Sequence, residues 1–466
     1  MLFSSTVFIF YFLPIVLLFY FISPKKWRNY VLLIASLIFY AWGGLLYFPL
    51  LIFSIVLNYI CGLFIEKYRE NAVKKKRVLI ISIVLNILFL GVFKYTNFIV
   101  DNLNALFHTS ICVVRIPLPI GISFYTFQSM SYVIDVYRRD GKVQKNIFNL
   151  ALYISMFPQL VAGPIVRYQT VDDQISNRTH SFDKFNAGLD RFIVGLFKKI
   201  VISNTVGELA TTIYEMNDDT ISISLAWLGA IAYMLQIYFD FSGYSDMAIG
   251  LGKVFGFDFL ENFNYPYISK SVSEFWRRWH ISLGSWFRDY IYIPLGGNRV
   301  SPLKVYQNLF VVWLITGIWH GASWNFVIWG LYFGVFIMLE RIFLQKLLNK
   351  IPNFFQHIYL LLIVLIGWVL FSQPDLPSTI AYLKTMLGLT DAPIINGYTM
   401  FYLKEYLVEL ILAIVASMPI INIVKHHIKL NRLSMIVKPI AICILFFIAI
   451  VYMINSTFNP FIYFNF

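Results

Sequence analysis

The sequence predicts an all-α polytopic membrane protein, because long apolar runs alternate with short basic segments and few residues are charged. Of the 466 residues, 59% are hydrophobic and only 13% are charged, whereas about 25% are charged in a typical soluble domain. The mean hydropathy is +0.70. A helix needs about 20 apolar residues to cross a bilayer, so the length accommodates about a dozen transmembrane helices. We expect one membrane-embedded domain, residues 1–466.

Positive charge is concentrated beside the apolar runs. The formal net charge is +13, but Lys and Arg gather in short clusters such as 25–28, 74–77, 341–350 and 425–438. Such clusters mark cytoplasmic loops of membrane proteins. The positive net charge is therefore explained by membrane topology, and we expect the lipid bilayer, and no nucleic acid, as a partner. With these segments inside, both termini are predicted to be extracytoplasmic.

Proline and glycine interrupt the apolar sequence in two places. Residues 117–121 read PLPIG, and residues 157–168 read FPQLVAGPIVRY. At membrane depth such interruptions are tolerated in re-entrant or broken helices that neighbouring helices shelter. Cys61, Cys112 and Cys443 are isolated, so no metal site or disulfide framework is predicted.

Charge and two histidines interrupt the apolar pattern in residues 271–321. His320 follows the apolar run 309–314, which places it well below the membrane surface. A buried intramembrane histidine often only packs one helix against another. Here, however, Trp-His occurs twice, at Trp279-His280 and Trp319-His320. Intramembrane ionisable groups commonly mark functional sites, and imidazole titrates near neutral pH, so the pattern predicts proton-transfer chemistry.

Three long blocks carry a family resemblance. FWRRWHISLGSWFRDYIYIPLGGNR, followed by GIWHG, closely resembles the membrane-bound O-acyltransferases (MBOAT), and within them the bacterial branch typified by the alginate O-acetyltransferase membrane subunit. YFDFSGYSDMAIGLGKVFGFDFLENFNYPY at 238–267 and FPQLVAGPIVRY at 157–168 are similar to further signatures of that branch. The matching blocks lie between about residues 119 and 340, the expected family core.

The resemblance implies an MBOAT-like bundle with re-entrant or broken helices around a central tunnel, in the plasma membrane of a bacterium. It implies transfer of an acyl group, expected to be acetyl from acetyl-CoA on the cytoplasmic side, for O-acetylation of an extracytoplasmic polysaccharide. A serine esterase-like (SGNH-type) partner outside the membrane is implied as well. No bound cofactor or metal is expected.

Acyl transfer to a hydroxyl needs a base and stabilisation of an oxyanion. His320 is the candidate base, with Gly317 and Gly321 expected to leave room for a substrate. His280 is the candidate partner, and it can orient His320, bind the carbonyl or relay a proton. Tryptophans are expected to keep the tunnel poor in water, which competes for the acyl group. These tunnel tryptophans are Trp276, Trp279, Trp319 and Trp324.

Further candidates for the tunnel and for donor binding fall into two groups. Basic residues can meet the phosphates of the donor, although they can equally obey the positive-inside tendency. Polar residues spaced by two are expected where a helix opens at Gly243, although they can equally cap a helix start. The candidates are Arg277, Arg278, Arg288 and Asp289 in the first group, and Asp240, Ser242, Tyr244 and Asp246 in the second.

Two alternatives remain open. A related branch transfers D-alanine from a carrier protein to teichoic acid, but the GIWHG and FDFSGYSDMAIG blocks are closer to the polysaccharide-acetylating branch. A transporter is the alternative from another class. It predicts corresponding interrupted helices in two halves, and the RRWH and GIWH segments do not recur as an internal repeat.

The C-terminal tail, residues 458–466, is aromatic where a water-exposed terminus would be polar. Its rings are expected to fold back into the protein or a partner, or to sit in an aromatic belt at the membrane interface. The pattern F-x-Y-F-x-F is similar to the C-terminal motif of the small partner subunit of teichoic acid D-alanylation, where a terminal tyrosine is thought to carry the acyl group. Tyr463 is therefore the candidate acyl carrier.

Overall fold

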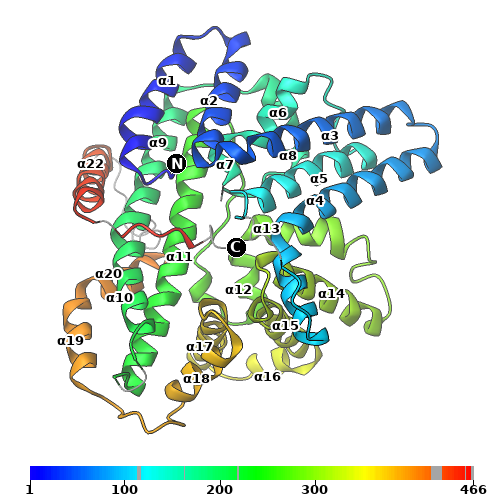
Figure 1. Ribbon diagram of the computed structural model, residues 1–466. Helices are drawn as coiled ribbons and strands as arrows, with labels where there is room; N and C mark the ends of the chain where they lie inside the picture. Colours follow the sequence, from blue (N-terminus) through cyan, green and yellow to red (C-terminus); the bar gives the residue numbers. More distant parts are fainter. Residues whose placement is uncertain (113–116, 162, 218–219, 421–432, 457, 463–466) are drawn as a thin grey trace. The chain divides into compact units, whose positions relative to one another are not determined.

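The computed structural model of the protein describes residues 1–112, 117–161, 163–217, 220–420, 433–456 and 458–462. Within these residues the regular structure is entirely helical, as predicted, and no β-strand occurs (Figure 1). The predicted basic segment 425–438 and the candidate Tyr463 lie wholly or largely outside the described residues.

The chain forms two compact units. The first comprises Met1–Phe192 and Tyr244–Leu260, and the second comprises Ile193–Gly243 and Glu261–Phe466. Two helices contribute to both units, α9 (Phe182–Phe197) and α11 (Ile223–Val254). The prediction of a single membrane-embedded domain stays a prediction.

The remaining helices of the first unit are α1 (Leu13–Ile22), α2 (Arg28–Gly43), α3 (Phe48–Lys67), α4 (Ala72–Phe107), α5 (Ile122–Arg138), α6 (Ile147–Ser155), α7 (Phe157–Leu160) and α8 (Tyr168–Asn177). Those of the second are α10 (Asn204–Tyr214), α12 (Val272–Arg278), α13 (Ile281–Phe287), α14 (Pro302–His320), α15 (Trp324–Leu339), α16 (Gln345–Leu348), α17 (Asn353–Ser372), α18 (Leu376–Met386), α19 (Gly397–Glu405), α20 (Leu407–Ala416) and α22 (Leu433–Asn455). Short 3₁₀ or π-helical turns are η1 (Phe8–Phe12), η2 (Lys25–Trp27), η3 (Leu45–Tyr47), η4 (Lys198–Ser203), η5 (Pro266–Ile268), η6 (Arg288–Tyr292) and η7 (Glu340–Leu344).

Six helices in the described part of the chain are long and apolar enough to cross a membrane: Leu45–Lys67, Ala72–Phe107, Ile223–Val254, Trp324–Leu348, Asn353–Ser372 and Val437–Asn455. Phe8–Ile22 and Leu407–Ala416 are shorter apolar helices. A dozen spans is therefore not confirmed. Much of the remaining apolar sequence forms short helices, and α12 and α13 have only seven residues each.

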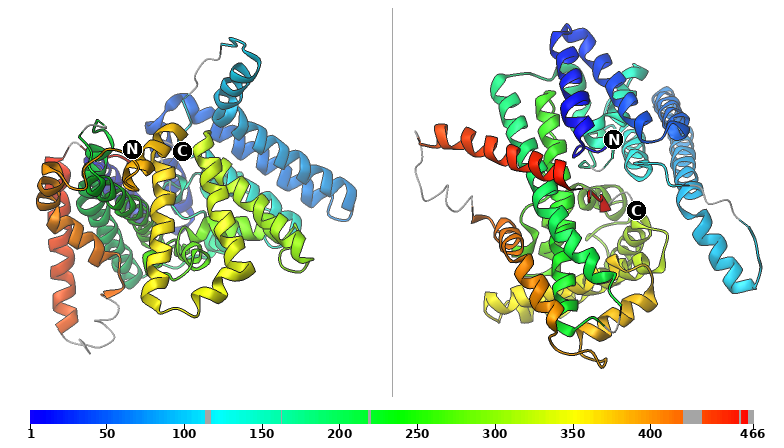
Figure 2. Two further views of the ribbon diagram at one scale, coloured as in Figure 1. Left: turned by 90° about the horizontal axis from the view of Figure 1, so that it is seen from below. Right: turned by 60° about the vertical axis from the view of Figure 1, so that its left-hand side comes forward.

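In the first unit, α3, α4 and α5 lie side by side (Figures 1 and 2). Residues 122–136 of α5 are all buried, and a small polar cluster joins α3 to α4. The Asn58 amide donates to Asn86 Oδ1 at 3.1 Å, and the Asn86 amide donates back to Asn58 Oδ1 at 2.9 Å. Buried amide pairs of this kind hold apolar helices together where lipid offers no hydrophobic driving force.

Both predicted interruptions of the chain are present. Before α5, Gly121 adopts φ +73°, and a Cβ there would lie 2.8 Å from the Leu160 carbonyl oxygen. Only glycine meets both demands without strain. In the second interruption α6 ends at Ser155, α7 lasts four residues, and no helix resumes until α8.

The predicted opening of a helix at Gly243 is wrong, because α11 runs without interruption through this position. A Cβ on Gly243 would lie 2.8 Å from the carbonyl oxygen of Gly195 in α9. The glycine therefore permits two helix backbones to approach closely, as small residues do in membrane proteins.

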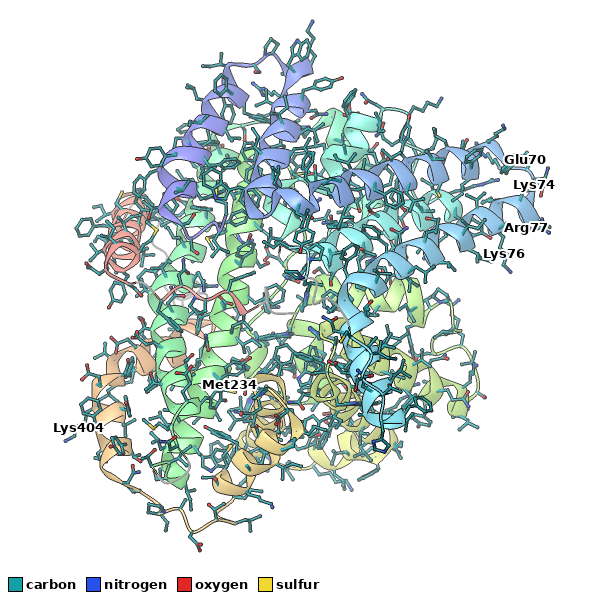
Figure 3. The ribbon with its side chains drawn as sticks, viewed as in Figure 1. Glu70, Lys74, Lys76, Arg77, Met234 and Lys404 are labelled. Carbon is teal, nitrogen blue, oxygen red and sulfur yellow. The ribbon has the colours of Figure 1, made fainter. Side chains whose placement is uncertain are left out.

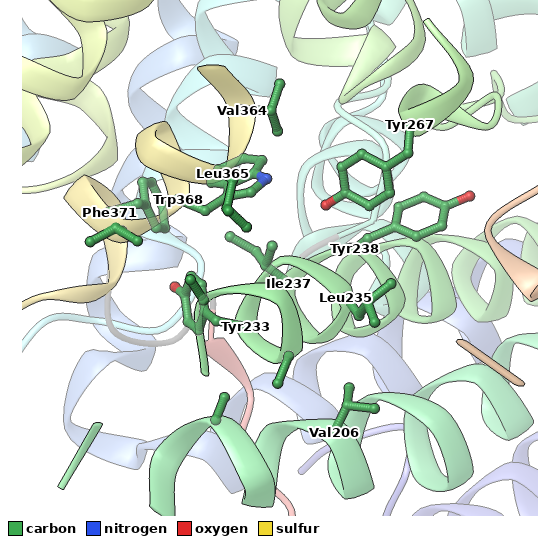
Figure 4. Close-up of a cluster of buried hydrophobic side chains, with 14 of the residues drawn as sticks. Val206, Tyr233, Leu235, Ile237, Tyr238, Tyr267, Val364, Leu365, Trp368 and Phe371 are labelled. Carbon is green, nitrogen blue, oxygen red and sulfur yellow. The ribbon is translucent and has the colours of Figure 1, made fainter. Parts of the chain in front are cut away.

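A cluster of buried aromatic and aliphatic side chains forms the core of the second unit. Figure 4 shows Tyr238 of α11 and Trp368 and Phe371 of α17 within it. The Trp279 ring packs against Trp368 with centroids 4.8 Å apart, and against Phe275 at 5.6 Å. The segments that carry His280 and His320 pack against this cluster.

Candidate active site

The site begins with α12, whose N-terminus is held by a carboxylate. Glu340, at the start of η7, is buried and accepts hydrogen bonds from the backbone N–H groups of Val272 (2.6 Å) and Ser273 (2.8 Å). It also accepts from the Ser273 hydroxyl at 2.6 Å and from the Tyr359 hydroxyl at 3.1 Å. A carboxylate at this place satisfies free N–H groups of the helix and complements its dipole. Glu340 thereby fixes the short helix that leads to His280.

His280 lies at the sharp turn between α12 and α13. Its backbone is left-handed, with φ 45°, and it is the N-cap residue of α13. The side chain is 2% exposed. Its imidazole packs edge-on against Phe241, with centroids 4.6 Å apart, so the ring sits in an apolar pocket at a strained turn. Non-glycine residues held in this backbone region often belong to functional sites.

Asn262 fixes the orientation of the His280 ring. Asn262 Oδ1 lies 3.1 Å from His280 Nδ1, and it also accepts from the Ser282 N–H at 3.1 Å and the Ser282 hydroxyl at 2.8 Å. A backbone N–H can only donate, so the shared atom is an acceptor oxygen. His280 Nδ1 must then carry the proton of the neutral ring. Nε2 is left with the lone pair that a general base or a relay requires.

His320 ends α14 inside an aromatic cage. It is 3% exposed, and its ring centroid lies 5.0 Å from that of Trp319, 4.8 Å from that of Trp329 and 5.5 Å from that of Phe371. Trp329 itself belongs to α15 and Phe371 to α17, so three helices enclose the imidazole. Such a surrounding excludes water from the ring.

Trp319 joins the two histidines. Its ring centroid lies 5.0 Å from that of His320 and 6.5 Å from that of His280. The structure therefore brings together the two Trp-His pairs that are 40 residues apart in the sequence. Trp319 is itself buried.

The glycines beside His320 have a different role from the one predicted. A Cβ on Gly317 would lie 2.4 Å from the Phe326 carbonyl oxygen, and a Cβ on Gly321 would lie 2.1 Å from the Phe326 ring. The prediction that they leave room for a substrate is wrong, because α15 and Phe326 fill that space. The glycines instead allow α14 and α15 to pack closely.

A cavity of about 300 Å³ lies beside His280. Its lining is mainly apolar, with Trp276, Trp279 and His280 from the α12–α13 segment and Thr316 from α14. Thr316 is one turn before His320 on the same helix. A cavity of this size and character suits a small acyl group and the thiol arm that carries it.

The candidate cations take two different positions. Arg277 and Arg288 line the cavity, and Arg288 donates to the carboxylate of Asp289 at 2.7 Å. Arg278 does not line it. Its guanidinium instead donates to Glu274 Oε1 at 3.0 Å within α12.

The four polar residues of α11 do not form one wall. Residues two apart on a helix point about 200° apart, so the spacing of two spreads these residues around α11. Tyr244 stacks on Phe3 at 4.5 Å and Asp246 accepts from Arg191 at 2.8 Å, both within the first unit. Ser242 is buried in the second unit. None of the four lines the cavity.

Asp240 instead belongs to a buried ion pair that holds the C-terminal tail. It lies 2.6 Å from Lys199 Nζ, and both side chains are 1% exposed. Asp240 Oδ2 accepts from the Ile462 N–H at 2.9 Å, while Lys199 Nζ donates to the Pro460 carbonyl. The described part of the tail is thus folded into the protein, with Phe461 and Ile462 buried. Ile462 belongs to the same core cluster as Trp279 and Trp329.

The structure does not place Trp324, one of the predicted tunnel tryptophans, at the cavity. Trp324 begins α15 and is 54% exposed. The sequence pattern does not predict the roles of Asn262 and Glu340, which support the histidine-bearing segment, or of Lys199, which holds the tail. Asn262 lies in the quoted block 238–267 and Glu340 at the edge of the family core, but their partners are distant in sequence.

Comparison with known proteins identifies the family. The profile of MBOAT, the membrane-bound O-acyltransferase family, matches residues 138–375. A probable alginate O-acetylase AlgI from Azotobacter vinelandii is 46% identical over 380 residues, which cover 81% of this chain and 76% of the relative. The chain belongs to the membrane-bound O-acyltransferase family. It is a multi-pass membrane enzyme, and this assignment decides for an acyltransferase and against a transporter.

Two other relatives of this acyltransferase differ in the acceptor that their names give. A peptidoglycan O-acetyltransferase from Helicobacter pylori is 34% identical and covers 100% of this chain and 98% of its own length. A teichoic acid D-alanyltransferase from Bacillus subtilis is 31% identical over 48% of this chain and 59% of its own length. The similarity to the two acetylating relatives therefore extends over far more of the chain.

Proposed function

We propose that this acyltransferase takes an acetyl group from a cytoplasmic thioester donor and passes it across the membrane for O-acetylation of an extracytoplasmic polysaccharide. The observation that carries the proposal is that the Trp319 ring lies near both His280 and His320, and that His280 lines an apolar cavity. The names of the relatives that match 81% and 100% of the chain support acetyl as the group and a polysaccharide as the acceptor.

In this proposal His320 is the general base. Its imidazole removes the proton of the attacking hydroxyl as the oxygen attacks the thioester carbonyl. The C–S bond breaks, and the departing thiolate takes up a proton. His280, held by Asn262 with Nε2 unprotonated, relays the proton or orients the carbonyl. The aromatic cage reduces competition from water.

Acetyl-CoA is the proposed donor. Arg277 and Arg288, at the cavity lining, are suited to the phosphates of a nucleotide donor, because guanidinium groups bind phosphate in bidentate fashion. The positive-inside distribution of Lys and Arg supports entry from the cytoplasm and extracytoplasmic termini. No bound cofactor or metal is part of the proposed chemistry.

Tyr463 is the proposed acyl carrier. The buried ion pair of Lys199 and Asp240 holds Pro460 and Ile462, directly before Tyr463 in the chain. The phenol oxygen attacks the thioester and forms a phenyl ester. Phenol has a pKa near 10 and is a good leaving group when an acceptor hydroxyl attacks. An extracytoplasmic serine esterase-like partner is proposed to receive the acetyl group and deliver it to the glycan.

A donor assay tests the proposal. Purified protein in nanodiscs is given either acetyl-CoA or a D-alanyl carrier protein, and acyl transfer is followed by release of free thiol. We expect turnover with acetyl-CoA and a loss of turnover in His280→Ala. Transfer that requires the loaded carrier protein and ignores acetyl-CoA would replace the proposal with teichoic acid D-alanylation.

A further inference from the structure

A second cavity, in the first unit, is polar and strongly basic. Its volume is about 330 Å³, and three segments that are distant in sequence line it, residues 25–30, 146–149 and 175–180. Its cations are Lys25, Lys26, Arg28 and Arg178, and His180 also lines it. No Asp or Glu is among the described residues of the lining.

The two arginines are held rigidly by neutral groups. Arg178 donates to the Tyr20 hydroxyl at 3.0 Å, to the Phe255 carbonyl at 3.0 Å and to the Ile175 carbonyl at 2.9 Å. Arg28 lies over the Tyr20 ring, 5.4 Å from its centroid, and donates to the Ser23 carbonyl. Within the described ranges, neither arginine has a carboxylate within ion-pair distance, so their charges are not neutralised by the protein.

Polar donors complete the cavity. The Asn29 amide donates to Asn149 Oδ1 at 3.1 Å, which orients the Asn149 side chain in the lining. Asn146 caps the N-terminus of α6 by accepting from the Phe148 N–H at 2.9 Å. The positive end of that helix dipole is therefore also near the cavity.

The pKa of His180, in the lining of the cavity, is lowered by its surroundings. Burial first, and then the charges of Arg28, Arg178 and Lys184, lower the pKa of His180 to about 4. Its Nε2 lies 2.8 Å from the Tyr20 hydroxyl. After burial, the charges of Arg28 and Arg178 are the largest causes of this lowered pKa, as the basic lining of the cavity predicts.

The surroundings of the cavity are those of a membrane interface. Ile22, at the end of apolar α1, is 74% exposed, and Trp27 is 52% exposed beside Lys25 and Lys26. Exposed Trp next to Lys is typical of the headgroup level of a bilayer. The positive-inside tendency accounts for cations in a loop, but it does not account for Arg178 and two asparagines that converge on the same cavity from other segments.

We propose that this cavity binds a phosphate group, supplied by the headgroup of an anionic phospholipid. Basic pockets between membrane helices on the cytoplasmic side suit such headgroups. Arg178 and Arg28 would hold the phosphate at the wall, with Lys25 and Lys26 closing over it. The site is separate from the residues assigned to acyl transfer, so it does not depend on the proposed function.

Binding of phosphatidylglycerol to the purified full chain tests this site. The test variant is Lys25→Gln/Lys26→Gln, because neither side chain has a hydrogen-bond partner in the described part of the protein and folding should be unaffected. The matched control is Lys74→Gln/Lys76→Gln, which removes equal charge at the far end of the α3–α4 hairpin (Figure 3). Native mass spectrometry and titration in nanodiscs measure affinity for phosphatidylglycerol against phosphatidylcholine.

We expect wild type and the control to prefer phosphatidylglycerol, and the test variant to bind it about 30-fold more weakly, since each basic residue near an anionic headgroup contributes about fivefold. Equal affinity in both variants, or no preference for phosphatidylglycerol in wild type, would overturn the proposal. A second arm titrates adenosine 3′,5′-bisphosphate into phosphatidylcholine nanodiscs. Binding there that only the test variant weakens would overturn the lipid source and assign the phosphate to a soluble nucleotide.

Discussion

Replacing Asn262 with alanine removes one oxygen that accepts three hydrogen bonds beneath His280. Those bonds come from His280 Nδ1, the Ser282 N–H and the Ser282 hydroxyl. Leaving a buried polar group without its partner costs about 1 to 3 kcal/mol. If that free energy is lost from the oriented imidazole, turnover falls roughly 5- to 150-fold, since 1.36 kcal/mol corresponds to a factor of ten in rate.

The assay is steady-state acetyl transfer from acetyl-CoA by protein in nanodiscs, with the melting temperature of each variant measured in parallel. Ser282→Ala is the control. It removes one donor to Asn262 and the long 3.4 Å contact of the Ser282 hydroxyl with His280 Nδ1, but it keeps the 3.1 Å contact between Asn262 and His280. Asn262→Asp keeps an acceptor oxygen and should retain more activity than Asn262→Ala. We expect kcat to fall in Asn262→Ala with little change in KM.

The role assigned to Asn262 is refuted if Asn262→Ala turns over at the wild-type rate. It is equally refuted if the loss in Asn262→Ala is no larger than in Ser282→Ala at matched stability, because the hydrogen bond to His280 would then contribute nothing. A change confined to KM would assign Asn262 to donor binding.

Three further predictions concern the tail, the anchoring of α12 and the response to pH. Tyr463→Phe keeps the ring but should eliminate glycan acetylation. In wild type, mass spectrometry should detect an acetyl adduct on the C-terminal peptide. Full activity in the variant would mean that the tail serves only in packing. Glu340→Gln removes the carboxylate that accepts from Val272 and Ser273 and should lower the free energy of unfolding by about 2 kcal/mol. The control Glu405→Gln, at an exposed position at the end of α19, should leave it unchanged. Equal melting temperatures in the two variants would contradict this prediction. Burial and the charges of Arg28, Arg178 and Lys184 lower the pKa of His180 to about 4, so the unfolded state binds the proton more readily than the folded state. The stability due to neutral His180 is therefore complete above about pH 6.5 and is lost as pH falls towards 4. A wild-type pH profile of stability that matches that of His180→Gln would contradict this prediction.

The helical class and the interruptions of the chain could be predicted because their causes are local. Composition decides that the chain lies in a membrane, and the closely spaced glycine and proline of residues 117–121 and 157–168 interrupt the helices there. Glycine at other positions is ambiguous. The sequence predicts open space at Gly243 and Gly317, but each faces a neighbouring helix backbone. Only the packed structure distinguishes close approach from open space.

The histidine pair could be predicted from the repeated Trp-His motif, but its supports could not. Asn262 precedes His280 by 18 residues, and Glu340 follows Ser273 by 67, so no periodicity connects them. Asp240 illustrates the same limit. Its polar spacing predicts a site wall, whereas its carboxylate pairs with Lys199 and with the tail more than 200 residues later.

Transfer of labelled acetyl groups by His320→Ala tests whether His320 is the general base. Wild type and variant, reconstituted in nanodiscs at equal amounts and with equal melting temperatures, are incubated with radiolabelled acetyl-CoA, and ester-bound label is counted on protein and acceptor. Because His320 is buried at Trp319 and is the proposed base, we predict rapid labelling with wild type and at least a hundredfold lower rate in the variant, the range that a general base contributes, about 10²- to 10⁴-fold. Labelling of His320→Ala at a rate within a few-fold of wild type would contradict the account.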